Sequence, residues 1–410
     1  MDLFDEFTSK SRKLKEIFDN AYDEAMAKTD RNTYQAMEAF IHNLNTMHSR
    51  AGAQVPFSSV NFGTDTSPEG RMVIKNYLLA TDAGLGHGET PIFPISIFKV
   101  KEGVNYNKED PSYDLFRLAC RVSAKRLFPN FSFLDASFNK KFLVEGDYNT
   151  EVGYMGCRTR VLANVCGPAV TPGRGNLSFT SINLPRIGIH HGIWINSKKM
   201  DYKTKLRTVL KHGTLSIGFI GLAECLKALT GKHHGESEES QRLGLEIVGY
   251  IRKKMNEATE KYHLNFSVIA TPAEGLSGRF VAIDRSIYGK IKGVTDRDYY
   301  TNSFHVPVYY KTSVKHKMEV EGKYHTLTNA GHISYIELDG DTVNNVDAFE
   351  SVVRIMHDSD IGYGAINHPV DRDPICGYVG VIKDVCPRCG RHECEGVEME
   401  KITCLECQGR

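Results

Sequence analysis

The sequence has no excess of charge of either sign and no long apolar run. Its 410 residues hold 51 Lys and Arg against 50 Asp and Glu, and a formal charge of +1 provides no global field for a nucleic acid or a charged membrane surface. The most apolar stretch, residues 214–229, is interrupted by Glu224 and Lys227, which argues against a membrane-spanning helix. We therefore expect neither nucleic-acid nor membrane partners, and any anion must be bound by local groups.

Targeting signals, internal repeats and low-complexity tracts are also missing. The acidic start, residues 1–6, lacks the basic-then-apolar layout of a signal peptide, which predicts a cytoplasmic protein. With 41% hydrophobic and 25% charged residues, the chain has the composition of a globular protein with a large core.

Hydrophobic spacing predicts helices that alternate with strands. Residues 34–47 and 243–258 have the spacing of amphipathic helices. Short apolar runs that read as strands cover residues 92–100, 177–182, 266–270, 306–310 and 332–338. This alternation favours an α/β sheet or barrel. The apolar pattern fades near Asp371, so we expect a large catalytic region over residues 1–370 and a small module over residues 371–410.

Cysteine is concentrated at the C-terminal end, where five of the ten cysteines follow residue 380. Two Cys-x-x-Cys pairs, separated by fourteen residues, can each hold one edge of a tetrahedral Zn²⁺. The predicted ligands are Cys386, Cys389, Cys404 and Cys407, with Cys376 and Cys394 as rivals. Four protein thiolates leave no open coordination position, so the metal would be structural. By contrast, Cys120 and Cys225 lie in apolar helical contexts and are expected to be buried, unreactive thiols.

A single cysteine, Cys157, lies in a glycine-bearing turn close to Arg158 and Arg160. Cations and exposed backbone N–H groups lower the pKa of a thiol, which would make this sulfur reactive. The residues alone favour the alternative, a buried structural cysteine.

The strand predicted at residues 266–270 runs into Thr271-Pro272-Ala273-Glu274, the start of a helix. Thr271 fits the N-cap, Pro272 the first helical position, and Glu274 would complete a capping box. The alternative is that free N–H groups at this helix start receive a phosphate. Sequence alone favours the ordinary cap.

Two adjacent histidines, His233 and His234, precede Gly235 and an acidic run. This arrangement predicts a solvated loop and a helix start rather than a metal site.

A series of longer motifs is spread over nearly the whole chain. They are HNLNTMHSRAG (42–52), QVPFSS (54–59), MGCR (155–158), GRGNL (173–177), INLPR (182–186), GFIGL (218–222), TPAE (271–274), TNSFHVP (301–307) and NHPVDR (367–372). In this order they resemble the anaerobic, class III ribonucleoside-triphosphate reductases, a family of glycyl-radical enzymes.

The resemblance implies a ten-stranded α/β barrel with a finger loop inside it and a C-terminal zinc module. It implies that Cys157, at the tip of the finger loop, is the thiyl radical that abstracts the ribose 3′-hydrogen. Asn176 would lie beside it and orient the substrate or a small reductant. The substrate phosphates would be received by Thr271, Pro272, Ala273, Glu274 and Gly275.

The implied reaction reduces ribonucleoside triphosphates to 2′-deoxyribonucleoside triphosphates, with formate as the electron donor. A separate radical-SAM activase would install the radical on a glycine. Members of this family are usually homodimers, and the helix at residues 34–47 is expected to contribute to that contact.

The chain departs from the family pattern in several places. The N-terminal ATP-cone and the opening barrel segment are not found, and residues 187–189 stand where the family has a long helical insertion. The Arg-x-x-Gly-Tyr radical site is expected after the zinc module, where only Gly409 is a formal candidate. These departures predict a fragment or a split subunit whose missing segments a partner chain supplies. The alternatives are an inactive remnant and a nucleotide-binding zinc-ribbon interaction protein. A pyruvate formate-lyase type of enzyme is disfavoured because its adjacent Cys-Cys pair is missing.

Overall fold

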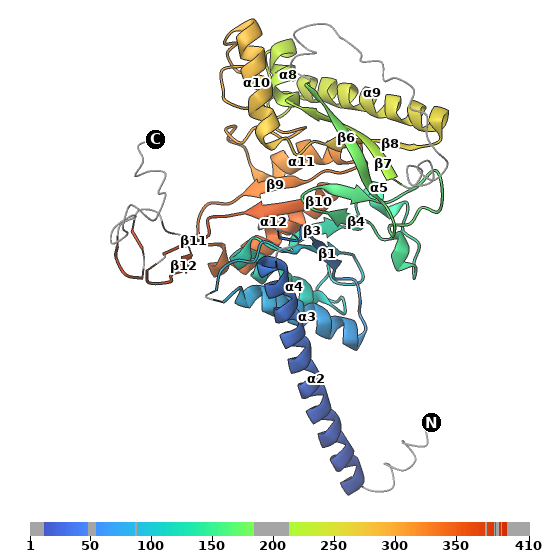
Figure 1. The fold of residues 1–410 in the computed structure, drawn as a ribbon, viewed down its shortest axis with the longest axis vertical. Coiled ribbons are helices and arrows are strands. Elements are labelled where there is room, and N and C mark those ends of the chain that lie inside the picture. The colour runs from blue at the N-terminus through green and yellow to red at the C-terminus, as the bar shows by residue number, and fades with distance from the viewer. Residues whose placement is uncertain are drawn as a thin grey trace.

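Two β-sheets form the centre of the protein, and helices cover them (Figure 1). The structure is a computed structural model that describes residues 12–47, 55–86, 88–183, 213–373, 375–380, 382, 385–386 and 388–391. The α-helices are α2 (Arg12–Thr46), α3 (Pro68–Ala83), α4 (Tyr113–Arg126), α5 (Ser137–Lys140), α8 (Leu222–Thr230), α9 (Glu238–Tyr262), α10 (Glu274–Tyr288), α11 (Val314–His325) and α12 (Val346–Asp358). Short 3₁₀ turns are η1 (Tyr148–Thr150) and η2 (Thr342–Asn344).

The larger sheet has five strands. These are β1 (Ser59–Phe62), β2 (Ile95–Val100), β3 (Asn130–Phe133), β10 (Tyr363–Asn367) and β9 (Ser334–Glu337), in that spatial order. Neighbouring strands are parallel except for β3 and β10, which are antiparallel. Helices α3 and α4 provide the crossovers from β1 to β2 and from β2 to β3, as parallel neighbours require.

The smaller sheet has three parallel strands, β6 (Gly175–Asn183), β7 (Gly213–Ile220) and β8 (Asn265–Ala270). It meets the segment that leads into β9, because Ala330 N donates to Val268 O and Ala270 N donates to Gly331 O, both at 2.9 Å. The two sheets are therefore joined on one side. Within the described residues β1 and β6 remain terminal strands, so closure into a ten-stranded barrel stays a prediction.

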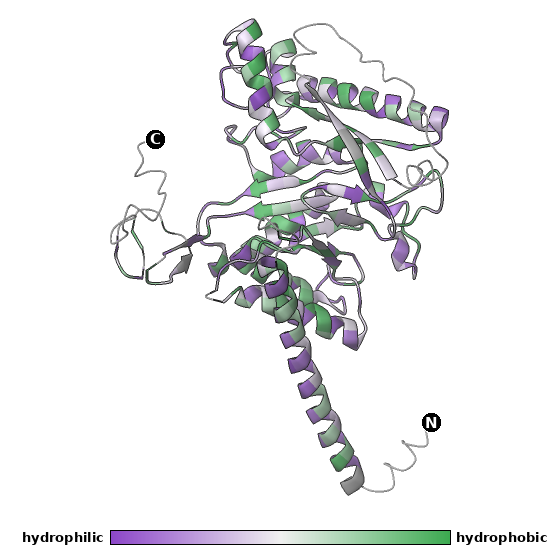
Figure 2. Cartoon of the chain, viewed as in Figure 1, coloured by the Kyte–Doolittle hydropathy of each residue, from purple (hydrophilic) through white to green (hydrophobic). Residues whose placement is uncertain are grey.

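Two apolar clusters hold the helices against the sheets. Phe98, Phe116 and Phe131 lie in the cluster between the larger sheet and helices α4 and α12. Phe219 and Val268 lie in the cluster between the smaller sheet and helices α8 and α9. Full burial of such a side chain contributes roughly 1.5–3 kcal/mol. Figure 2 shows hydrophobic and hydrophilic residues mixed along these helices, as expected for amphipathic helices that cover a core.

Most of the predicted elements are confirmed. Residues 34–47 fall in or beside α2 and residues 243–258 in α9, and four of the five predicted strands correspond to β2, β6, β8 and β9. The prediction for residues 306–310 is wrong, because this segment is a turn in which Tyr310 N donates to Pro307 O at 2.9 Å. A proline has no N–H to give to a β-ladder, which explains the failure.

The environment of the histidine pair also differs from the prediction. Ser237 caps α9 after a loop, as expected, but His233 and His234 are only 2% and 1% exposed. His234 Nε2 lies 2.7 Å from Phe304 O, and the His233 ring packs edge-on against Tyr310. Tertiary partners therefore replace the solvent that the sequence suggested.

The two thiols expected to be unreactive are buried in the helices predicted for them. Cys120 in α4 is 0% exposed and Cys225 in α8 is 3% exposed. Burial raises the pKa of Cys225 to about 12, so the thiol stays protonated.

The chain continues from β10 into a small antiparallel pair, β11 (Asp371–Arg372) and β12 (Val379–Gly380). Figure 1 shows this pair to one side of the two sheets. The boundary between residues 370 and 371 stays a prediction. None of the helices in the described part of the chain is both long and apolar enough to cross a membrane.

Candidate active site and metal centre

Cys157 lies in the turn of a short hairpin formed by β4 (Gly153–Met155) and β5 (Thr159–Val161). The preceding residue, Gly156, has φ +58°, and a Cβ there would lie 3.0 Å from the Phe57 ring. Both facts favour glycine at this position. We call this hairpin, which has the partly buried Cys157 at its tip, the finger; its identity with the finger loop of the resemblance stays a prediction.

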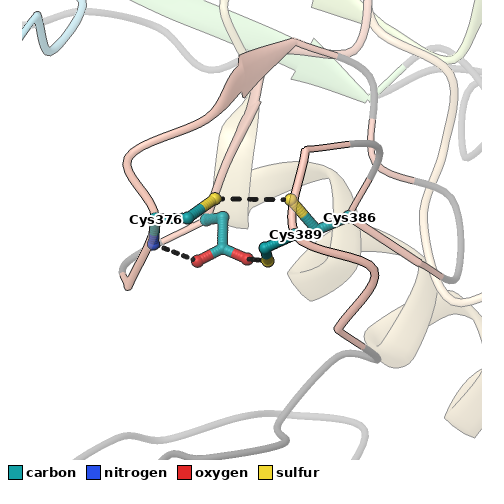
Figure 3. A group of neighbouring side chains, drawn as sticks. Cys376, Cys386 and Cys389 are labelled. Carbon is teal, nitrogen blue, oxygen red and sulfur yellow. Dashed lines mark hydrogen bonds between the residues drawn. The ribbon is translucent and has the colours of Figure 1, made fainter.

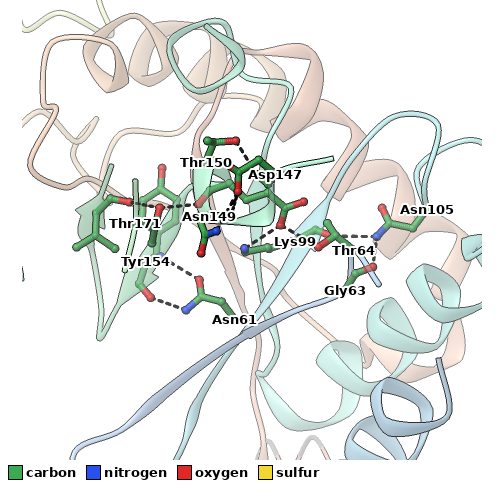
Figure 4. Close-up of polar contacts among 12 residues, drawn as sticks. Asn61, Gly63, Thr64, Lys99, Asn105, Asp147, Asn149, Thr150, Tyr154 and Thr171 are labelled. Atoms are coloured by element: carbon green, nitrogen blue, oxygen red, sulfur yellow. Dashed lines mark hydrogen bonds and ion pairs between the residues drawn. The ribbon is translucent and has the colours of Figure 1, made fainter. Parts of the chain in front are cut away.

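Strand β1 fixes one side of this hairpin. The amide of Asn61 donates to Tyr154 O at 2.8 Å and accepts from Tyr154 N at 2.9 Å (Figure 4). Closer to the tip, Gly156 N donates to Ser59 Oγ at 2.8 Å. Side chains of β1 thus satisfy backbone groups of the finger that no strand pairs.

A buried ion pair supports the base of the finger. Glu151, which is 4% exposed, lies 3.0 Å from Lys99 Nζ and accepts a hydrogen bond from Thr64 Oγ1 at 2.9 Å. Lys99 and Thr64 reach this point from the larger sheet and the segment after β1 (Figure 4). Thr171 Oγ1 donates to the Glu151 carbonyl at 2.6 Å. An ion pair and hydrogen bonds of Glu151 therefore hold the base of the finger in place.

The two arginines near Cys157, Arg158 and Arg160, form hydrogen bonds with residues outside the hairpin. Arg158 Nη1 donates to the carbonyls of Ala270 and Thr271, at 3.2 and 3.1 Å. Arg160 Nε donates to Asn139 Oδ1 at 2.8 Å. Their guanidinium groups anchor the finger to the end of β8 and to α5.

A partly buried tyrosine, Tyr335, and a fully buried one, Tyr363, lie near the finger tip. Burial raises the pKa of Tyr335 on β9 and of Tyr363 on β10, and the charge of a Cys157 thiolate adds to both shifts. Tyr363 Oη donates to Gly156 O at 3.5 Å, and its ring stacks on Tyr154 with centroids 4.5 Å apart. The finger tip, with the partly buried Cys157, therefore lies beside aromatic side chains of the central strands.

The structure brings Asn176 to the finger. It lies at the start of β6, its Nδ2 donates to Thr159 Oγ1 at 3.3 Å, and its Oδ1 is 3.5 Å from Ser216 Oγ. Thr159 follows Cys157 by two residues on the same hairpin. The two residues predicted to be catalytic thus belong to one part of the molecule.

The capping prediction at Thr271 is wrong. Helix α10 begins at Glu274 with Ala273 at its N-cap, and no side chain caps it. Thr271, the residue after β8, instead accepts with its Oγ1 from Ser181 Oγ of β6 at 3.3 Å, across the intervening strand β7. A Cβ on Gly275 would meet no atom of the described residues within 4 Å, so among these residues the first turn borders open space. An uncapped helix start beside open space is compatible with an anion.

A cavity of about 170 Å³ lies between the first turns of α10 and strand β9. Its lining includes Ser277 of α10, the segment around Asn302 and His305, and Tyr335. Tyr335 also interacts electrostatically with Cys157. The cavity therefore shares Tyr335 with the surroundings of the finger, and Ser277 follows the predicted phosphate-binding turn by two residues.

A separate group of possible metal ligands lies in the small C-terminal module. One ligand atom from each of Asp373, Cys376, Cys386 and Cys389 falls within 4.8 Å of the others. Cys376 Sγ and Cys386 Sγ are 3.5 Å apart, and Cys389 Sγ is 3.4 Å from Asp373 Oδ2 (Figure 3). Two thiolates on one tetrahedral Zn²⁺ would be roughly 3.8 Å apart, so the arrangement fits zinc.

Asp373 has further contacts. Its Oδ1 accepts from the backbone N of Ile375 and Cys376 and pairs with Arg391, which holds the pKa of this carboxyl well below its usual range. The structure therefore brings the rival ligand Cys376 beside the predicted Cys386 and Cys389. The other candidates, Cys394, Cys404 and Cys407, lie outside the described residues.

Sequence reasoning did not identify Asn61, Tyr335 or Tyr363 as parts of the site. Asn61 closely follows the QVPFSS motif, which was a weak signal. The two tyrosines lie in apolar segments, where the sequence suggests only a role in the core. Their position near the finger tip follows only from the fold.

Comparisons with known proteins agree with this geometry. The chain matches a family described as "Anaerobic ribonucleoside-triphosphate reductase" over residues 2–200 and 189–403. The anaerobic ribonucleoside-triphosphate reductase of Escherichia coli (strain K12) is 30% identical over an alignment of 432 positions, which covers 93% of this chain and 59% of that protein. The protein of that name from Enterobacteria phage T4 is 32% identical over an alignment of 442 positions, which covers 94% of this chain and 70% of that protein.

A solved structure shares the fold. The anaerobic ribonucleotide reductase from Thermotoga maritima with glycerol in the active site has a TM-score of 0.62 at 16% identity, covering 90% of this chain and 64% of that chain. This chain spans about 59% of the length of the Escherichia coli relative. With the finger hairpin, the parallel strands and a family match that extends over nearly all residues, the chain belongs to the anaerobic ribonucleoside-triphosphate reductase family.

Proposed function

We propose that this chain carries the catalytic region of an anaerobic reductase that converts ribonucleoside triphosphates to their 2′-deoxy forms. The supporting observation is the position of Cys157, partly buried at the tip of a finger that is anchored on one side by β1 and on the other by the end of β8. In this proposal a thiyl radical on Cys157 abstracts the ribose 3′-hydrogen. The S–H and ribose C–H bonds are of similar strength, so the transfer is reversible.

The remaining residues bind and orient. The neutral amide of Asn176 would hold a ribose hydroxyl or the carboxylate of formate without competing as an acid. Formate would supply two electrons and leave as carbon dioxide, while the 2′-hydroxyl leaves as water. The phosphates would be bound by backbone N–H groups of the turn formed by Thr271, Pro272, Ala273, Glu274 and Gly275. Packing around Cys157 would protect the radical from water and oxygen.

A glycyl radical, installed by a radical-SAM activase, would supply the unpaired electron when present. We include in the proposal a homodimer. Reduction by formate belongs to the same proposal.

The test is anoxic co-expression with the activase and any partner chain encoded nearby. A glycyl doublet in the EPR spectrum and a deoxynucleotide product are expected. Cys157→Ser should keep the doublet and lose the product. Cys166→Ser is the matched control, since this partly buried thiol bonds to His263 O outside the site, and it should keep both. If the unmodified chain with its partner gives neither the glycyl doublet nor the deoxynucleotide product, the proposal fails and the chain is an inactive remnant.

A structural Zn²⁺ in the C-terminal module is the second part of the proposal. The predicted set was Cys386, Cys389, Cys404 and Cys407, and the described geometry supports adding Cys376 as a candidate. The metal would hold together a segment with little apolar core. The same cluster is the feature that favours the alternative, a nucleotide-binding zinc-ribbon interaction protein. Such a protein would keep its binding function in the Cys157→Ser variant.

A further inference from the structure

His305 belongs to the segment between α10 and α11 and lines the 170 Å³ cavity beside Tyr335. Its side chain is 10% exposed, and Nδ1 lies 3.3 Å from Glu321 Oε2. No step of the proposed reaction uses this histidine. A buried polar side chain at a cavity needs hydrogen-bond partners on both ring nitrogens.

Glu321 holds His305 in a fixed orientation. The carboxylate is fully buried in α11, and it accepts from Val306 N at 2.9 Å and from Ser334 Oγ at 2.6 Å. Lys317 Nζ lies 3.7 Å from its other oxygen. Burial opposes its ionisation, but Lys317 and His305 outweigh burial and lower the pKa of Glu321 to about 2. An ionised carboxylate at Nδ1 requires the proton there, which leaves Nε2 as an acceptor.

Two residues of the cavity lining have a buried acceptor atom without a partner among the described residues. Burial lowers the pKa of His305, so its ring is neutral near pH 7. In the described part of the chain, neither His305 Nε2 nor Asn302 Oδ1 has a hydrogen-bond partner, although both atoms are buried. Both residues line the same cavity. A buried acceptor without a donor is unfavourable, so a ligand that brings donors would be stabilised there.

The charges of the cavity do not suit a phosphate. Lys317 is the cation of the lining, and its ammonium is already paired with Glu321 and bonded to Tyr335 O. Glu337, also in the lining, is acidic. The volume is below the roughly 300–1,000 Å³ of pockets that hold a whole small ligand, so it suits one part of a nucleotide.

We propose that this cavity is a subsite for an uncharged hydrogen-bond donor of the nucleotide, with His305 and Asn302 as acceptors and Glu321 as the positioning residue. The inference deepens the proposed function and rests on it. The donor comes either from the ribose hydroxyls or from N–H groups of the base. Tyr335 lines this subsite and interacts electrostatically with Cys157.

The experiment measures nucleotide binding by calorimetry to the full chain with Cys157→Ser, which prevents turnover. The probes are the four ribonucleoside triphosphates and ribose 5-triphosphate, which lacks a base. His305→Ala and Asn302→Ala should each weaken binding by roughly three- to tenfold, the effect of losing one hydrogen bond. His305→Gln keeps an acceptor, so its loss of affinity should be smaller than that of His305→Ala. Glu321→Gln should weaken binding as His305→Ala does. His316→Ala is the control, because this exposed histidine of α11 does not line the cavity.

The probes identify the donor. A loss that persists with ribose 5-triphosphate assigns it to the hydroxyls, and a loss confined to the base-bearing nucleotides assigns it to the base. Unchanged affinity in His305→Ala and Asn302→Ala, with nucleotide still bound, would overturn the subsite and leave the proposed function intact. If the folded chain binds none of the nucleotides, the subsite and the proposed function both fail.

Discussion

The side-chain amide of Asn61 forms hydrogen bonds with both backbone groups of Tyr154, at 2.8 and 2.9 Å. A neighbouring strand would normally provide this pair of bonds, and here one side chain of β1 provides it. Because Cys157 follows Tyr154 by three residues on the same hairpin, the position of the sulfur depends on β1.

Replacing Asn61 should therefore affect both stability and turnover. Asn61→Ala leaves the N–H and C=O of Tyr154 without these partners, which should lower the free energy of unfolding by about 1–3 kcal/mol. Deoxynucleotide formation by the activated protein should fall more than nucleotide binding, because a misplaced finger impairs the reacting geometry. Urea unfolding and product assays measure the two effects. Asn344→Ala, at an exposed site, is the control, and an Asn61 variant no weaker than it would refute this account.

The ion pair between Glu151 and Lys99 makes a second prediction. Lys99→Met leaves the carboxylate of Glu151 buried without its cation and should cost about 3–5 kcal/mol in unfolding free energy. The double variant with Glu151→Leu removes both charges and should recover most of that loss. Denaturant titration of the single and double variants decides the matter. Equal losses in the two would show that packing, rather than the unpaired charge, is responsible.

The metal cluster predicts a metal content and a loss of structure on chelation. The purified chain should contain about one Zn²⁺, and a strong chelator should remove it and expose the segment around Cys376 and Cys386 to proteolysis. Cys376→Ser should lower the zinc content measured by mass spectrometry. Cys120→Ser, a buried thiol in α4, is the matched control and should retain the metal. Full zinc in the Cys376 variant would exclude it as a ligand and favour the pairs at 386/389 and 404/407.

Buried neutral histidines predict acid sensitivity. Burial lowers the pKa of His234 to about 4 and that of His325 to about 3, from an ordinary value near 6.5. Below pH 6.5 the unfolded chain binds protons that the folded chain does not, so stability falls as the pH decreases toward these lowered values. The shift at His234 alone corresponds to at most about 3 kcal/mol. Glu321 contributes little at pH 5, because its carboxylate is largely ionised in both states there.

The measurement is urea unfolding at pH 7.5 and pH 5. The unmodified chain should lose stability between these values, and His234→Gln should lose less, since the variant has no imidazole to protonate at this position. His316→Gln, at an exposed position, should behave as the unmodified chain does. Identical pH dependence in all three proteins would contradict the assignment to His234.

The sequence by itself determined the features that depend on near neighbours in the chain. The periodicity of residues 243–258 was sufficient to predict a helix, and the alternation of apolar runs was sufficient to predict an α/β fold. The ordered motifs were sufficient for the family, and the spacing of Cys386 and Cys389 pointed to a metal. Each of these signals is carried by residues close together in sequence.

Only the tertiary structure decided which distant residues became partners. Asn61 and Tyr154 are 93 positions apart, and no local pattern predicts that their strands meet. The same holds for Tyr335 and Tyr363 around Cys157. Thr271 was suited to a helix cap, but its hydroxyl found Ser181 on β6 and the helix began at Glu274 without a side-chain cap. Local preferences contribute about 1 kcal/mol at such positions, and burial with partners across the sheet outweighs them.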